Sequence, residues 1–324
     1  CIDYQQGDET WRTTNNGFYN IDFEDADSGS GIKEIQVKIS TTSDDTGIIV
    51  NWTTIITTQT YSYTQNWQLS ESVWSEIPSG SQKNYVSIRA IDFAYNTSTV
   101  LTNAFFILKD TIPPQIVDLQ EGDDVWRKFG GKTYNVNFYD YESLLRGGQY
   151  IARSGPNPTD PSWPLGWVQI FSSTGTKEFT TDWSVDFANL PEGINYIFVR
   201  ASDTAGLWNE PSVYVFYIKK DITAPTIVDN QDGDYTWRLT SGTLYAVFFQ
   251  DTISGVTTAQ YQIKDPQGNM LVDWTTIFGG TTPYTNYNSS WSISEFAFNQ
   301  LVEGTTNYVY VRCNDAAGNI FTLL

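Results

Sequence analysis

Eight aspartates recur at turn positions where they could cap turns or bind a divalent cation. A carboxylate in a turn commonly accepts hydrogen bonds from backbone amides two residues further on. Carboxylates are also oxygen ligands of the kind that hard cations prefer, so residue type alone leaves both roles open. The eight are Asp25, Asp140 and Asp251 after an alternating strand, Asp92, Asp203 and Asp315 after an Arg-containing strand, and Asp110 and Asp221 before a proline-containing segment.

These aspartates follow an internal repeat. Gly-Asp-x-x-Trp-Arg runs surround Trp11, Trp126 and Trp237, which lie 115 and 111 residues apart. A period of this length corresponds to one compact domain rather than to a short solenoid unit. The predicted domains are residues 1–111, 112–222 and 223–324, the third with its last strand apparently incomplete.

Period-two patterns indicate the strands that must position the aspartates. In the middle copy, Tyr134, Val136 and Phe138 alternate with asparagines, as expected for a half-buried strand. Each copy has about seven such strands with turn signals every 8–12 residues. A helical turn is expected at most within residues 183–190 and its counterparts. The pattern predicts an all-β chain of three tandem immunoglobulin-like Greek-key β-sandwich domains.

Composition excludes several functions. The 324 residues contain 18 Lys and Arg against 37 Asp and Glu, and this net charge of -19 repels phosphate backbones, so no nucleic-acid partner is expected. It suits divalent cations, or it serves only solubility. Histidine is absent, which excludes Ser-His-Asp and Cys-His catalysis and His-ligated zinc. No apolar run is long enough to span a membrane.

Two motifs give the chain a family resemblance. The loop Asp315-x-Ala317-Gly318-Asn319 and the joint Asp221-Ile222-Thr223-Ala224-Pro225 resemble the tandem bacterial Ig-like repeats of large cell-surface adhesins. The resemblance covers all three copies, although the first copy has Tyr95-Asn96 and the second Gly206-Leu207 where Gly-Asn is usual. It implies an extracellular location and, in some arrays, calcium at the joints between domains.

Strand order in such a sandwich brings the aspartates to the joints. The loops after the second and sixth strands lie at the end where the chain enters, next to the last strand of the preceding domain. Clustered carboxylates repel one another unless a cation neutralises them, and Ca²⁺ accepts six to eight oxygen ligands. We therefore expect Asp110, Asp140 and Asp203 to converge at the first joint, Asp221, Asp251 and Asp315 at the second, and Asp25 and Asp92 to face any domain upstream.

The leading functional hypothesis is a non-catalytic extracellular rod. Short joints with prolines, such as residues 110–114, favour a semi-rigid array. The rod would be a structural or adhesive section of a surface adhesin or stalk, with neighbouring Ig-like domains of the same or identical chains as partners. A string of sandwiches offers no deep cleft for paired catalytic carboxylates, so no enzyme is expected.

Two alternatives remain open at this point. The chain could be a structural subunit of an extracellular filament or surface layer that is completed by strand exchange. It could instead be an array of carbohydrate-binding modules for surface glycans, for which Trp163, on an insertion of the second copy, is the candidate ligand contact.

Recurrence also predicts packing roles. Cys1 and Cys313 occupy apolar or small-residue positions of different copies, so both are expected to be buried free thiols. Three arginines that recur on the outward strand face are expected to stack on the tryptophans of the Gly-Asp-x-x-Trp-Arg loops. These arginines are Arg89, Arg200 and Arg312.

Overall fold

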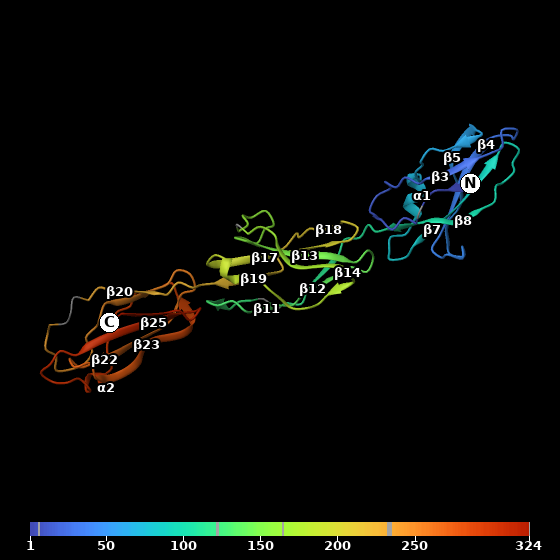
Figure 1. Ribbon diagram of the computed structural model, residues 1–324. Coiled ribbons are helices and arrows are strands. Elements are labelled where there is room, and N and C mark those ends of the chain that lie inside the picture. The colour runs from blue at the N-terminus through green and yellow to red at the C-terminus, as the bar shows by residue number, and fades with distance from the viewer. Residues whose placement is uncertain (6, 121–122, 164, 232–234, 324) are drawn as a thin grey trace.

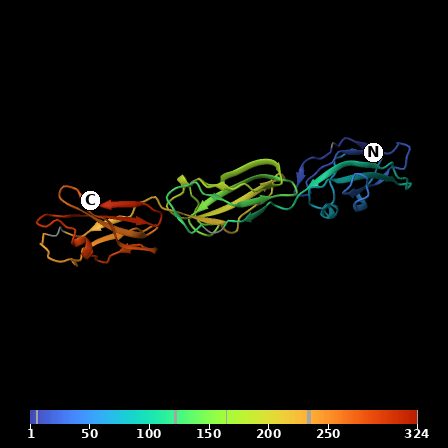
Figure 2. The same cartoon turned by 90° about the horizontal axis from the view of Figure 1, so that it is seen from below.

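The computed structural model describes residues 1–5, 7–120, 123–163, 165–231 and 235–323. Strands dominate these residues, and the helical segments among them are short, so the chain is all-β as predicted. The strands gather into three groups that follow one another along an elongated molecule (Figure 1, Figure 2). We call these groups the first, second and third units, and each has its own hydrophobic core.

The first unit contains a small and a large sheet. In spatial order, the small sheet consists of β1 (Ile2–Asp3), β3 (Ile21–Glu24) and β6 (Ser62–Tyr63). The large sheet consists of β2 (Trp11–Arg12), β8 (Leu101–Lys109), β7 (Asn84–Asp92), β4 (Ile32–Ser40) and β5 (Ile48–Thr60). The strand β2 runs parallel to the end of β8, whereas the other pairs are antiparallel.

The second unit repeats this plan. Its small sheet consists of β15 (Glu178–Phe179), β12 (Val136–Tyr139) and β9 (Gln115–Asp118), and β11 (Thr133–Tyr134) pairs with β16 (Trp183–Ser184). Its large sheet consists of β10 (Trp126–Arg127), β19 (Phe216–Lys220), β17 (Gly193–Asp203), β13 (Leu145–Arg153) and β14 (Val168–Thr176), with β18 (Trp208–Asn209) also on β17.

The third unit follows the plan only in part. Its small sheet consists of β20 (Thr226–Asp229), β21 (Val247–Gln250) and β24 (Asn286–Tyr287). Its large sheet consists of β23 (Met270–Tyr284), β22 (Val256–Lys264), β25 (Tyr308–Asp315) and β26 (Ile320–Leu323). Within the described residues, it has no counterpart of the parallel pairs β2–β8 and β10–β19.

Alternation along the strands builds each core. In β4, Ile35, Val37 and Ile39 are fully buried, while the residues between them are partly exposed. The second tryptophan of each copy lies in the core, as its recurrence suggests: Trp67, Trp183 and Trp291 are all buried. The alternation of side chains between the two faces of a strand thus determines which residues point into the core.

Short helical segments connect the sheets at equivalent places. They are α1 (Glu71–Glu76), the 3-10 turn η1 (Phe187–Asn189) and α2 (Glu295–Phe298). Ser70 and Ser294 cap the two α-helices by accepting hydrogen bonds from backbone amides in the first turn. Asp186 makes no such bond at η1, where the segment stays a single turn.

The three arginines stack on tryptophans as predicted, but not on the predicted ones. Arg89, Arg200 and Arg312 lie over the rings of Trp52, Trp167 and Trp274, with 4.3, 4.0 and 4.2 Å from the guanidinium carbon to the ring centroid. Trp52 lies in β5, Trp167 directly precedes β14, and Trp274 lies in β23. In each unit one strand, β4, β13 or β22, separates the arginine's strand from the tryptophan's. The Gly-Asp-x-x-Trp-Arg loops instead lead to the opposite edge of the large sheet.

One cysteine prediction is also wrong. Cys313 is buried in the third core as expected, but Cys1 is exposed. Cys1 precedes β1, a two-residue edge strand whose residues are themselves exposed, so its side chain does not reach the first core. Its sulfur lies 3.7 Å from the hydroxyl oxygen of Ser98.

Candidate cation sites at the two joints

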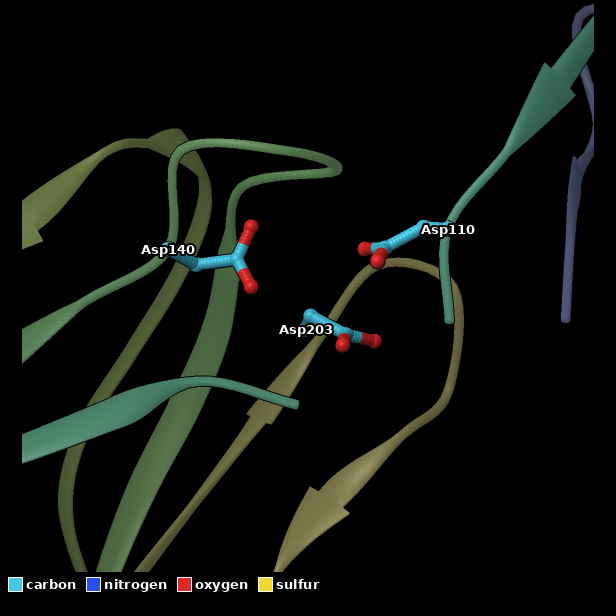
Figure 3. Close-up of side chains that lie close together, drawn as sticks. All are labelled: Asp110, Asp140 and Asp203. Atoms are coloured by element: carbon cyan, nitrogen blue, oxygen red, sulfur yellow. The ribbon is translucent and has the colours of Figure 1, made fainter. Parts of the chain in front are cut away.

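Three aspartates from two units meet at the first joint. Asp110 follows β8 of the first unit, whereas Asp140 follows β12 and Asp203 ends β17, both of the second unit. One carboxylate oxygen from each lies within 4.8 Å of the others, and all three side chains are buried. Their carboxyl groups face a common space (Figure 3). We call this set the first cluster.

Each aspartate of the first cluster caps a turn with one oxygen only. Oδ1 of Asp110 accepts from the amide of Ile112 at 2.9 Å, and Oδ1 of Asp203 from that of Leu207 at 2.8 Å. Oδ1 of Asp140 accepts from the amide of Leu144 at 2.6 Å. The Oδ2 atom of all three carboxylates is buried and receives no hydrogen bond from the protein. Turn capping therefore leaves one oxygen of each carboxylate for another partner.

Burial and mutual repulsion disfavour the charged state of this cluster. Burial raises the pKa of Asp203 to about 6, opposed by hydrogen bonds and reinforced by the charges of Asp110 and Asp140. Burial also raises the pKa of Asp140, with the charge of Asp110 adding to it. A buried carboxylate without a compensating partner is costly, and a cation among the three would offset that cost.

The second joint gathers the equivalent residues, which we call the second cluster. Asp221 follows β19 of the second unit, whereas Asp251 follows β21 and Asp315 ends β25 of the third unit. Their ligand atoms also lie within 4.8 Å of one another, and all three residues are buried. Burial raises the pKa of Asp221, and the charges of the other two carboxylates add to this effect.

Protein donors satisfy much more of the second cluster. Oδ1 of Asp251 accepts from three consecutive amides, and Oδ2 of Asp221 accepts from the amide of Ser254 at 3.2 Å. The side-chain amide of Asn319 donates to Oδ2 of Asp315 at 2.7 Å and to the carbonyl oxygen of Asp221 at 3.1 Å. In the described part of this cluster, no carboxylate oxygen is both buried and without a donor.

Asp25 and Asp92 join neither cluster. Oδ2 of Asp25 accepts from the amide of Gly31 at 2.7 Å, and both oxygens of Asp92 accept from Asn96. These hydrogen bonds, chiefly the one from the Asn96 side chain, lower the pKa of Asp92. Tyr95 adopts a φ of 65° at the place where the other two copies use glycine, so the unusual residue does not prevent the turn.

Trp163 is partly buried and packs against the second core. Its backbone amide donates to the carbonyl oxygen of Ala152 at 3.1 Å, which fixes the insertion to β13. The ligand contact expected from its place on an insertion stays a prediction.

Sequence reasoning missed three side chains that act at the second joint. Glu192 accepts from the amide of Ile222 at 2.6 Å, Lys128 donates to the carbonyl oxygen of Gly318, and Asn319 bridges the two units. The Gly318-Asn319 pair drew attention to Asn319 in the sequence but did not predict its contacts. Nothing in the sequence pattern marked Lys128.

Comparisons with known proteins leave the family open. No protein-family model and no curated protein matches the chain. Among solved structures, the native conformation of Escherichia coli alpha-2-macroglobulin is similar at 10% identity over 97% of this chain, with a TM-score of 0.23. The chain spans 21% of that protein's length, and a likeness of this size carries no argument about function. No helix among the described residues is long and apolar enough to cross a membrane.

Proposed function

We propose that the chain is a non-catalytic extracellular rod, a section of a cell-surface adhesin or stalk. The rod would consist of three tandem Ig-like Greek-key sandwich domains whose first joint is stiffened by calcium. The observation that carries the proposal is the set of buried carboxylate oxygens without a protein donor at Asp110, Asp140 and Asp203.

The donor chemistry of the first cluster favours calcium. All the side-chain ligands are hard carboxylate oxygens, with no sulfur or imidazole nitrogen, as expected for Ca²⁺ rather than Zn²⁺. Three carboxylates leave room in a shell of six to eight ligands for backbone carbonyls and water. Extracellular calcium sites typically bind with Kd of roughly 10⁻⁴–10⁻³ M, and we expect an affinity in this range for the first cluster.

A bound ion would act on the orientation of the units. Asp110 follows the last strand of the first unit, whereas Asp140 follows β12 and Asp203 ends β17, both in the second unit. An ion shared by all three connects the units through bonds that the short joint alone does not provide. Calcium would therefore stiffen the rod at this joint and also stabilise the second unit, which supplies two of the three ligands.

Calcium binding to the full chain tests this proposal. After chelation, isothermal titration should show binding near millimolar affinity, and small-angle scattering should show a longer, better-defined maximum dimension when calcium is added. Asp203→Asn should weaken the binding at least about tenfold, because it removes one charged ligand.

Asp92→Asn is the matched control, since Asp92 occupies the equivalent turn of the first unit but joins no cluster. It should leave both measurements unchanged. Calcium binding that is equal in the wild type and in Asp203→Asn would refute a site at the first cluster.

A further inference from the structure

The Gly-Asp-x-x-Trp-Arg motif has no part in the two aspartate clusters, yet it takes the same place in the first and second units. It supplies β2, which pairs with the end of β8, and β10, which pairs with the end of β19. Among the strand pairs of the described residues, these two alone are parallel. The motif therefore joins the segment that enters a unit directly to the strand that leaves it.

A further backbone hydrogen bond extends each contact to the joint. The amide of Asp110 donates to the carbonyl oxygen of Arg12 at 3.1 Å, and the amide of Asp221 donates to that of Arg127 at 3.0 Å. Both aspartates directly follow the last strand of their unit. We call β2 with the end of β8 the first clasp, and β10 with the end of β19 the second clasp.

A buried ion pair holds the short strand of each clasp. Asp8 and Asp123 are 7% and 1% exposed, and each pairs with the arginine four residues later. Nε and Nη2 of Arg12 both donate to Asp8, and the same two nitrogens of Arg127 donate to Asp123. A guanidinium that donates through two nitrogens has a well-defined orientation. The ion pairs thus fix the residue whose carbonyl oxygen accepts the aspartate amide.

The second clasp also has a side-chain tie on the surface. Oδ1 of Asp124 accepts a hydrogen bond from Nζ of Lys219 at 3.0 Å and another from the hydroxyl group of Tyr217. Asp124 lies just before β10, whereas Tyr217 and Lys219 lie in β19. Because Asp124 is exposed, its ion pair is expected to contribute little to folding stability. Its effect on mechanical resistance can therefore be measured separately from its effect on stability.

Tension along the molecule loads a clasp in a defined direction. The units follow one another, so the chain enters the second unit at the first joint and leaves it at the second joint (Figure 1). A pull on the ends draws the segment before β10 towards the first joint and the end of β19 towards the second. Since the strands are parallel and their hydrogen bonds run between them, these pulls shear the bonds together instead of opening them one after another.

We propose that the Gly-Asp-x-x-Trp-Arg motif forms tension-bearing clasps that keep the first and second units folded when the rod is pulled at its ends. Each clasp passes the load from the entering segment to the leaving strand, so the core strands between them stay outside the load path. The inference rests on the proposed function in one respect, namely that a section of a stalk or adhesin carries load along its axis. It requires no cation.

Force measurements on the full chain in chelator test the second clasp. Optical-tweezer handles attach through Ile112→Cys and Ile222→Cys, two exposed positions that flank the second unit, in a chain that also carries Cys1→Ser. At constant force, Asp124→Ala should unfold the second unit about threefold faster, because the load falls on fewer contacts, while its unfolding in denaturant should stay close to that of the wild type.

Glu210→Ala is the matched control. Glu210 forms an exposed ion pair with Arg200 at 3.3 Å in the same unit, but this pair lies outside the clasp. The substitution should leave the unfolding rate unchanged both under force and in denaturant. Equal unfolding rates of Asp124→Ala and wild type under force, or equal acceleration by Asp124→Ala and Glu210→Ala, would overturn the proposal.

Asp123→Asn should have the larger effect, because it removes the charge of a buried pair. Unfolding under force should become at least about tenfold faster, and this factor should exceed the one measured in denaturant. If the variant does not fold, the comparison of Asp124→Ala with Glu210→Ala still decides. All these measurements are made without calcium, so their failure leaves the proposed cation site untouched, and a failed calcium titration leaves the clasp untouched.

Discussion

The two acidic clusters are built from equivalent residues, but protein donors satisfy them to different extents. Their last turns are alike, since Gly206 and Gly318 have φ of 93° and 83°, and Leu207 and Asn319 each donate an amide to the preceding aspartate. The side chains differ. The side-chain amide of Asn319 donates to Asp315 and to the carbonyl oxygen of Asp221 in the second unit, whereas the side chain of Leu207 has no donor group.

This difference teaches that backbone and side-chain donors together set how far a joint satisfies its carboxylates, since Oδ2 of Asp221 receives the Ser254 amide and Oδ2 of Asp315 receives the side chain of Asn319. The second joint uses Asn319 and contacts such as that of Lys128 with Gly318, all supplied by the chain itself. The first joint leaves three buried oxygens without a donor. We therefore expect calcium to matter more at the first joint, and five variants or conditions can break that comparison.

The largest expected effect comes from Asp203→Asn in calcium-free protein. Removing the charge that burial disfavours should stabilise the second unit by about 2 kcal/mol at pH 7. With calcium the sign should reverse, because a ligand is lost. Calorimetry of the second unit's transition with and without chelator measures both. Destabilisation in chelator would contradict repulsion within the first cluster.

The next effect separates the joints directly. Asn319→Leu should destabilise the third unit by about 1–2 kcal/mol, because it leaves Oδ2 of Asp315 without its donor. Calcium should then recover part of the loss, since the second cluster would resemble the first.

The converse variant is Leu207→Asn, which introduces the missing amide at the first joint. It should reduce the calcium-induced change in scattering and leave the third unit unaffected. If both variants behave like the wild type in calcium titrations, the side chain at this position does not set the difference.

A pH change of calcium-free protein should have an effect of about 1 kcal/mol at the first cluster. In the folded state the pKa of Asp203 is raised to about 6 from its ordinary value of 3.8. Between these values the folded state binds more protons than the unfolded state, so stability falls as pH rises. The second unit should thus be more stable at pH 5 than at pH 7.

Denaturant titrations at the two pH values measure this effect, with Asp203→Asn as the reference that lacks the titrating group. Calcium affinity should change in the opposite direction and decrease towards pH 5, because protons compete for the same carboxylates. A pH profile that the asparagine variant shares in full would assign the effect to other groups.

The sequence predicts where the aspartate clusters lie better than it predicts which of their oxygens lack a donor. Period-two strands around residues such as Val136 and Phe138 predict the all-β class, and strand order places Asp140 and Asp203 at the same end of a unit. That convergence depends on topology alone, which the repeat displays three times. Whether an oxygen lacks a donor depends on single side chains that no periodic pattern records.

The wrong predictions have the same origin. Recurrence identified Arg200 as a stacking residue but assigned it to the wrong tryptophan, because its partner depends on which strand is the neighbour in the sheet. Cys1 shares a sequence position with buried isoleucines but precedes an edge strand of two residues. Equivalent positions therefore predict the type of contact better than the burial at a chain's outermost strand.

The smallest expected effect tests whether the second joint is held by the chain's own contacts. Lys128 of the second unit donates to the carbonyl oxygen of Gly318 in the third unit and is partly exposed. Lys128→Ala should cost about 0.5 kcal/mol, because water replaces most of the lost hydrogen bond. Residual dipolar couplings should nevertheless show a wider range of orientations at the second joint and none at the first. Lys132→Ala is the matched control, since Lys132 contacts Asp123 within its own unit. Equal broadening by both variants would mean that Lys128 does not orient the third unit.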